Sequence, residues 1–144
     1  MRLATNLAAA LTASFLILAT SPAALASTHE TTADLAEQSR MLAPRATKAY
    51  LMVQQGINPE AGRRLLAESV SRLDQNLAAL RSAKLDDTAH AKLSAVETRW
   101  SSVRARLTAA PDATGAKALY DDTEALQTAT QHLAMAINST PHAA

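Results

Sequence analysis

Two arginines on one stretch of the chain, Arg40 and Arg45, carry its most specific chemistry. A guanidinium group is planar and charged at any cellular pH, and its fork of donors suits planar oxyanions such as nitrate, nitrite or a carboxylate. Both arginines are therefore candidate ligand-binding residues. The alternative for Arg40 is solvation or an ion pair with Glu37 or Asp34. For Arg45 we favour a structural ion pair or a snorkelling side chain.

Residue patterns for catalysis and for metal binding are missing from the sequence. It contains no cysteine, no glycine-rich phosphate loop and no nucleophile elbow. The adjacent carboxylates Asp86-Asp87 and Asp121-Asp122 would point in different directions on a helix, where such residues more often cap or solvate it. The histidines form no i, i+4 pair and no Glu-x-x-His motif. We predict no enzyme activity, no catalytic residues, no metal site and no cofactor.

The arginines lie on a stretch, residues 34–53, that predicts a helix with two partly apolar faces. At 100° per residue, the stripe that should face the core comprises Leu35, Leu42, Ala46, Ala49 and Val53. Arg40 falls almost opposite Leu42. The side that carries Arg40 also holds Ala33, Pro44 and Leu51, with Thr47 adjacent. Because a second apolar face usually means a second partner, we predict that these four residues form a dimer or partner face.

Four helices account for the sequence between residues 34 and 138. We expect them at residues 34–55, at 59–83, from 86 or 87 to a turn at 109–114, and from 112 or 113 to 138. Their apolar residues recur three and four positions apart, and the predicted core includes Leu42, Leu66, Leu73, Leu77, Trp100, Leu126 and Leu133. Strand signals are missing. The sequence therefore predicts an all-α protein, an up-down-up-down antiparallel four-helix bundle.

The boundaries of the first two helices have local signals. Gly56 is a natural helix terminator, Asn58 reads as an N-cap, and Pro59 suits the first helical position. Pro44 lies inside the first helix, where it removes a hydrogen bond to the carbonyl of Arg40. We expect either a kink there or a helix that begins late.

A haem site is a minor alternative. Helices 3 and 4 should be antiparallel, so His90 and His132 should lie toward the same end of the bundle as Met41. A Met on the first helix and a His on the last are similar to the haem ligation of b-type cytochrome bundles. The sequence has no Cys-x-x-Cys-His motif for covalent haem, and His132 lies off its own apolar seam.

The N-terminal segment predicts export. Arg2 precedes an apolar run at residues 7–19, and Ala24-Leu25-Ala26 forms a small-x-small cleavage site. We therefore expect a signal peptide at residues 1–26 with cleavage after Ala26, a bundle at 27–138 and a disordered tail at 139–144. The alternative is an uncleaved N-terminal anchor. No later stretch is long and apolar enough to span a bilayer, so we expect a periplasmic or secreted product.

Charge limits the partners. The chain has 14 Lys and Arg against 13 Asp and Glu, and removal of Arg2 leaves the two signs balanced. A nucleic-acid-binding protein needs a basic patch, so we predict no nucleic-acid partner.

The segment around Arg40 resembles a known family. Ser39 to Arg45 followed by Lys48-Ala49-Tyr50 resembles the signature that opens the PilJ-type domain, the periplasmic sensing module of type IV pilus chemoreceptors and of NarX-type nitrate/nitrite sensors. The matching residues are Ala36, Arg40, Met41, Leu42 and Arg45. Residues 56–61, 77–80 and Trp100 also resemble the family, and the likeness covers residues 34–138.

The resemblance implies a periplasmic, non-enzymatic sensor or binding module. In NarX-type sensors the arginine that matches Arg40 comes from two subunits and clamps one anion at the dimer axis. The resemblance thus implies a homodimer that holds a small anion or metabolite near Arg40. With no second membrane span, it would act through a partner such as a membrane receptor or sensor kinase. The alternative is a structural or interaction protein that docks another bundle on the same face and binds no small molecule.

Overall fold

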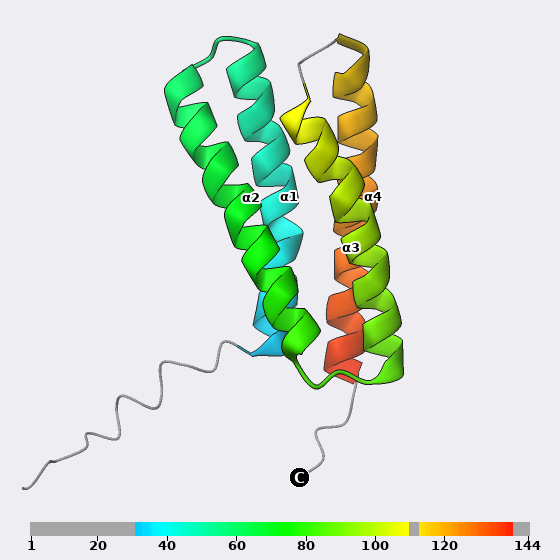
Figure 1. The fold of residues 1–144 in the computed structure, drawn as a ribbon. Coiled ribbons are helices and arrows are strands. Elements are labelled where there is room, and N and C mark those ends of the chain that lie inside the picture. Colours follow the sequence, from blue (N-terminus) through cyan, green and yellow to red (C-terminus); the bar gives the residue numbers. More distant parts are fainter. Residues whose placement is uncertain (1–30, 110–112, 140–144) are drawn as a thin grey trace, which may run out of the picture.

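A computed structural model describes residues 31–109 and 113–139 of the chain. Within them it contains four α-helices: α1 Thr32–Gln54, α2 Pro59–Ser82, α3 Asp87–Thr108 and α4 Ala113–Ser139. Consecutive helices run in opposite directions (Figure 1). The prediction of an all-α four-helix bundle is confirmed. The predicted signal peptide and residues 140–144 of the predicted tail lie outside the described residues.

Capping side chains set where the helices begin. Thr31 and Asp34 form a capping box, in which the Asp34 N–H donates to the Thr31 hydroxyl at 3.1 Å and the Thr31 N–H donates to the Asp34 carboxylate at 3.0 Å. α1 therefore begins two residues before the predicted start. The Asp86 carboxylate accepts from the Ala89 N–H at 2.7 Å and caps α3. α1 continues through Pro44, so the alternative of a late helix start is wrong.

The turn between α1 and α2 uses two left-handed residues. Gly56 has φ +67° and Asn58 has φ 45°. Glycine adopts this conformation without steric cost, and asparagine tolerates it better than most residues. The Asn58 side chain then accepts from the Ala61 N–H at 3.4 Å, and Pro59 occupies the first turn of α2 as predicted.

The bundle consists of two helical hairpins, which contact each other mainly through α1 and α4. α1 packs extensively against α2 and α4, and α3 packs against α4, whereas α2 and α3 make few contacts with each other. Figure 1 shows the α1–α2 hairpin beside the α3–α4 hairpin. The α2–α3 side of the bundle is therefore its more open side.

The core contains leucines from all four helices together with small residues from α1. The predicted core residues Leu42, Leu73, Leu77, Trp100, Leu126 and Leu133 are buried, and Leu66 is partly buried against them. The alanines of α1 allow a neighbouring helix to approach closely, and α2 has Gly62 at its contact with α1. A Cβ on Gly62 would lie 2.8 Å from Val53 Cγ2 and 3.1 Å from the Ala49 carbonyl oxygen. Gly62 is thus a contact point between α1 and α2.

The buried side of α1 is turned relative to the predicted stripe. Ala36, Ala43, Thr47 and Tyr50 are buried, whereas Leu35 and Val53 are only partly buried. The reason is that α1 packs against two helices at once, so its buried arc is wide and extends toward α4. The side that carries Pro44 and Leu51 consequently lies at the border with α4 and not directly opposite the core.

Candidate functional site

Arg40 forms an ion pair within its own helix. Its Nε donates to Glu37 Oε1 at 2.9 Å, and a second guanidinium nitrogen contacts the same oxygen. This hydrogen bond raises the pKa of Arg40 and lowers the pKa of Glu37. The Arg40 side chain is 29% exposed. Of the alternatives that the sequence left open for an isolated chain, the structure therefore shows the pair with Glu37.

Arg45 is held by a different helix. Its guanidinium lies 3.3 Å from the Glu68 carboxylate of α2, and both side chains are about half exposed. Arg40 contacts a residue of α1, whereas Arg45 reaches across to α2. The structure thus does not bring the two candidate ligand-binding arginines together at one site within a protomer.

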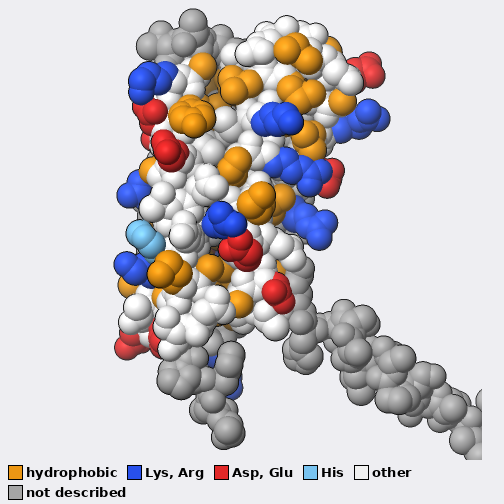
Figure 2. Space-filling view, turned by 180° about the vertical axis from the view of Figure 1, so that it is seen from behind, with side chains coloured by type: hydrophobic (Ala, Val, Ile, Leu, Met, Phe, Trp, Pro, Cys, Tyr) orange, Lys and Arg blue, Asp and Glu red, His pale blue; other side chains and the backbone are white. Residues whose placement is uncertain are grey.

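A groove between α1 and α4 contains most of the predicted partner face. It has a volume of about 440 Å³, and Pro44, Thr47 and Leu51 line its α1 side. Ala33 is partly buried three turns before Pro44 and does not line the groove. Figure 2 looks onto this side of the molecule, where hydrophobic side chains lie among charged ones. The predicted face is therefore one wall of a groove between two helices.

Thr47 is buried beneath this groove. It is 5% exposed, and its hydroxyl oxygen lies 2.7 Å from that of Thr123 on α4. The Thr123 hydroxyl also donates to the Leu119 carbonyl at 2.7 Å. Because a hydroxyl has one proton, Thr47 must donate to Thr123. Within one protomer Thr47 joins α1 to α4, and its side chain is only marginally accessible to a partner.

The α4 wall of the groove was missed in the sequence analysis. It is formed by Tyr120, Thr123, Glu124 and Gln127. Tyr120 is 61% exposed, which is unusual for so large a side chain. The spacing of these residues, three and four positions apart, is the signal that could have found them. Lys48 and Glu124 also line the groove, and neither has an ion-pair partner among the described residues.

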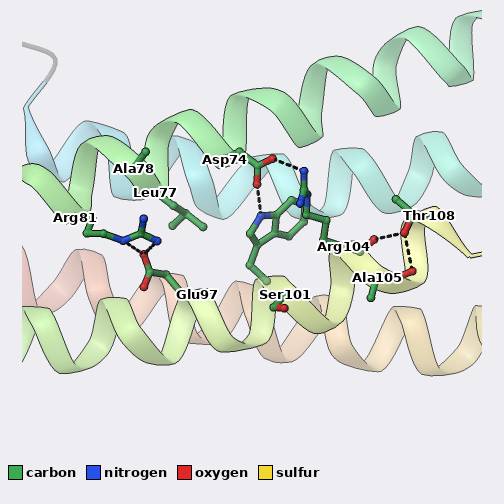
Figure 3. A pocket seen from close by; sticks show the side chains of 10 residues that line it. Asp74, Leu77, Ala78, Arg81, Glu97, Ser101, Arg104, Ala105 and Thr108 are labelled. Carbon is green, nitrogen blue, oxygen red and sulfur yellow. Dashed lines mark hydrogen bonds and ion pairs between the residues drawn. The ribbon is translucent and has the colours of Figure 1, made fainter.

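A larger groove, of about 610 Å³, lies between α2 and α3 (Figure 3). Two ion pairs cross it, Arg81 with Glu97 and Arg104 with Asp74, whose nearest atoms are 2.5 Å and 3.0 Å apart. The indole N–H of Trp100 donates to Asp74 at 2.7 Å. These charged groups already hold partners on the opposite helix. These ion pairs and this hydrogen bond therefore join the α1–α2 hairpin to the α3–α4 hairpin.

The residues considered for haem lie on the outside of the bundle. Met41 is 58% exposed, and His90 and His132 are exposed as well. They do not face a shared space inside the bundle. In the described part of the chain, no group of three or more His, Cys, Asp or Glu side chains is placed to hold a metal ion. Within residues 31–109 and 113–139, no helix has the length and hydrophobicity needed to cross a membrane.

Comparison with known proteins gives one match. Residues 32–128 match the model of the PilJ family, described as the N-terminal domain of type IV pili methyl-accepting chemotaxis transducers. No curated protein and no solved structure matches the chain.

Proposed function

Because this chain belongs to the PilJ family of N-terminal domains of type IV pili methyl-accepting chemotaxis transducers, we propose that it is a periplasmic, non-enzymatic sensory module. It pairs with a second copy of itself through the α1–α4 groove and holds a small anion near Arg40. It passes the bound state to a membrane receptor or sensor kinase. The family's description supports the sensory role, and the groove supports the pairing.

The observation that carries the proposal is the exposed apolar surface along the α1–α4 groove. Pro44 and Leu51 on α1 and Tyr120 on α4 contribute apolar surface to one continuous hollow. Aromatic side chains are enriched at the centres of protein interfaces, where they fill pockets on the partner. A second copy would cover Tyr120 and place one α1–α4 face on another.

The charges of the groove fit a two-fold arrangement. In a two-fold dimer, each contact occurs twice with the two copies exchanged. Lys48 on one wall can then meet Glu124 of the second copy, while Glu124 meets Lys48 of the second copy. Both residues line the groove from opposite helices and lack an ion pair within the described protomer. The face is therefore self-complementary in charge.

Charge reversal tests this arrangement by sedimentation velocity. Lys48→Glu alone and Glu124→Lys alone should each weaken self-association, because each places like charges together at both contacts. A mixture of the two variants should associate again, since every contact in the mixed dimer joins opposite charges. Arg64→Glu reverses an exposed charge of α2 and serves as the control. A wild-type chain that stays monomeric, or a mixture no better associated than its components, contradicts the proposal.

The proposed anion site at Arg40 is supported by the position of this residue, on the same side of α1 as Pro44 and Leu51. It lies one turn before Pro44, so its counterpart on a second copy would approach along the shared face. Two facing guanidinium groups repel each other, and an anion between them relieves that repulsion and couples ligand binding to dimer geometry. The exposed pair with Glu37 contributes little and is easily exchanged for a ligand oxyanion.

Thermal unfolding with a panel of oxyanions tests the role of Arg40. Nitrate, nitrite and acetate at constant ionic strength should include at least one anion that raises the Tm of the wild type but not of Arg40→Ala. Arg45→Ala removes an arginine that holds Glu68 instead and should keep the response. If no anion raises the Tm, or if the Tm of Arg40→Ala rises equally, anion binding at Arg40 is excluded. Self-association without any anion response would then favour the second candidate, an interaction bundle without a small-molecule ligand. The observation behind this candidate is that Arg40 already holds Glu37.

A further inference from the structure

A third groove lies between α3 and α4, on the far side of α4 from the α1–α4 groove. Its volume is about 260 Å³. Lys92 and Arg99 line it from α3, and Thr128 and His132 line it from α4. Three alanines, Ala95, Ala125 and Ala129, supply its remaining surface. The groove thus combines an apolar floor of methyl groups with basic side chains.

The register of the two helices places His132 between the two cations. Arg106 and Asp122 form an ion pair across α3 and α4 with 2.6 Å between the nearest atoms. Ten residues along each antiparallel helix from that pair, position 96 of α3 lies level with position 132 of α4. Lys92 and Arg99 are about one turn to either side of position 96. The three basic side chains therefore border the same short groove.

The charge of this groove is uncompensated. No carboxylate lines it, and neither Lys92 nor Arg99 has an ion-pair partner among the described residues. The α2–α3 groove differs, because its two arginines each hold a carboxylate of the opposite helix. On α4, Asp121 holds Lys117 and Asp122 holds Arg106, while Glu124 lines the α1–α4 groove on another side of the helix. A positive potential therefore remains at the α3–α4 groove.

We propose that the α3–α4 groove binds a small aliphatic dicarboxylate. Two permanent cations balance a dianion, and the planar guanidinium of Arg99 suits bidentate contact with one carboxylate while Lys92 meets the other. His132 supplies a ring N–H donor in either protonation state. The Thr128 hydroxyl already donates to the Glu124 carbonyl at 3.1 Å, so it forms part of the wall.

The volume of the groove and its apolar surface suit a ligand with a short carbon chain. Pockets for drug-sized ligands occupy roughly 300–1,000 Å³, so a groove of about 260 Å³ suits a smaller molecule. Arg99 is seven positions after Lys92, which places their Cα atoms about 10.5 Å apart along the helix. Long side chains from these positions can converge on the two ends of a short dicarboxylate, whose methylene groups would rest on the alanine methyls.

Titration of the isotopically labelled chain with sodium succinate, followed by NMR, tests the proposal directly. Amide shifts should saturate and should be confined to the groove, including Ala95, Arg99, Ala129 and His132. Butyrate has the same number of carbons but one charge, and sulfate has two charges but no carbon chain. Both, with sodium chloride at matched ionic strength, should give weak shifts that do not saturate. Shifts that are absent, scattered over the surface or equal for sodium chloride overturn the proposal.

Variants then test whether Lys92 and Arg99 bind the dicarboxylate. Arg99→Gln and Lys92→Gln should each weaken succinate binding roughly tenfold, because each removes one charge-assisted contact. Arg72→Gln removes an exposed arginine of α2 and should leave binding unchanged. Equal binding by Arg99→Gln and the wild type, or equal losses in Arg99→Gln and Arg72→Gln, overturns the assignment. Arg40→Ala should retain the succinate shifts, so this site stands or fails independently of the anion proposed at α1.

Discussion

Thr47 of α1 and Thr123 of α4 form a hydrogen bond inside the bundle, with 2.7 Å between their hydroxyl oxygens. The Thr123 hydroxyl in turn donates a hydrogen bond to the Leu119 carbonyl. The two threonines therefore have unequal roles: Thr47 is the donor to Thr123, and Thr123 is both acceptor and donor. This chain of hydrogen bonds links the first helix to the last beneath the α1–α4 groove.

The unequal roles predict unequal costs of substitution. Thr47→Val removes one donor but leaves the Thr123 hydroxyl bonded to Leu119, so it should lower the free energy of unfolding by about 0.5–1.5 kcal/mol. Thr123→Val leaves the Thr47 hydroxyl buried without its partner and should cost about 1–3 kcal/mol. The double variant should cost less than the sum of the two. Urea unfolding measures all three, and a larger cost for Thr47→Val would contradict this direction of donation.

The contact at Gly62 predicts a destabilising glycine-to-alanine change within a helix. Alanine is the better helix former by about 1 kcal/mol, yet its Cβ would lie 2.8 Å from Val53 Cγ2. The overpacking should outweigh the propensity, so Gly62→Ala should lower the free energy of unfolding by about 1–3 kcal/mol. The cost should shrink in a Val53→Ala background. Ser71→Ala on the exposed side of α2 should be close to neutral, and an equal effect at both positions would exclude the packing explanation.

The fold could be predicted from the sequence because it depends on local signals. Apolar residues three and four apart fixed the number of helices, and Asn58, Pro59 and Asp86 marked helix starts that the structure contains. The capping box at Thr31 and Asp34 was missed, although its residue types and spacing were visible. The position of Pro44 suggested a kink or a late start, but the helix begins well before Pro44, at the Thr31–Asp34 capping box.

The side of α1 that is buried could not be predicted as well. A helical wheel centred on Leu42 describes a helix with one neighbour, whereas α1 has two main neighbours. Apart from Tyr50, the additional buried positions are small or polar, such as Ala36, Ser39 and Thr47, and hydrophobicity does not distinguish them from surface. The spacing of Tyr120, Thr123, Glu124 and Gln127 places them on one side of α4. Their position beside α1 could not be predicted, because one helix does not reveal which residues of another lie next to it. The pair between Arg40 and Glu37 was visible as an i, i+3 spacing.

Trp100 and Asp74 predict that one carboxylate contributes more than its ion pair suggests. Asp74→Ala removes the acceptor of the indole N–H as well as the partner of Arg104, and should cost about 1.5–3 kcal/mol. Arg104→Ala breaks only an exposed ion pair and should cost less than about 1 kcal/mol. Asp74→Asn keeps a carbonyl acceptor and should lie between them. Urea unfolding followed by Trp100 fluorescence separates the cases, and equal costs for Asp74→Ala and Arg104→Ala would assign the effect to the ion pair instead.

The ion pair between Glu37 and Arg40 predicts a specific response to pH. The hydrogen bond from Arg40 lowers the pKa of Glu37 in the folded chain, so the stability it contributes is complete above the carboxyl's ordinary value of 4.5 and is lost as pH falls through the lowered pKa. Arg40→Gln should therefore raise the Glu37 titration midpoint, as followed by carboxyl-carbon NMR. Arg45→Gln is the control, because Arg45 pairs with Glu68 and should leave the Glu37 midpoint unchanged. An anion bound at Arg40 should also raise this midpoint, because it competes with Glu37 for the guanidinium. A midpoint that ignores both Arg40→Gln and the bound anion would mean that the pair does not persist in solution.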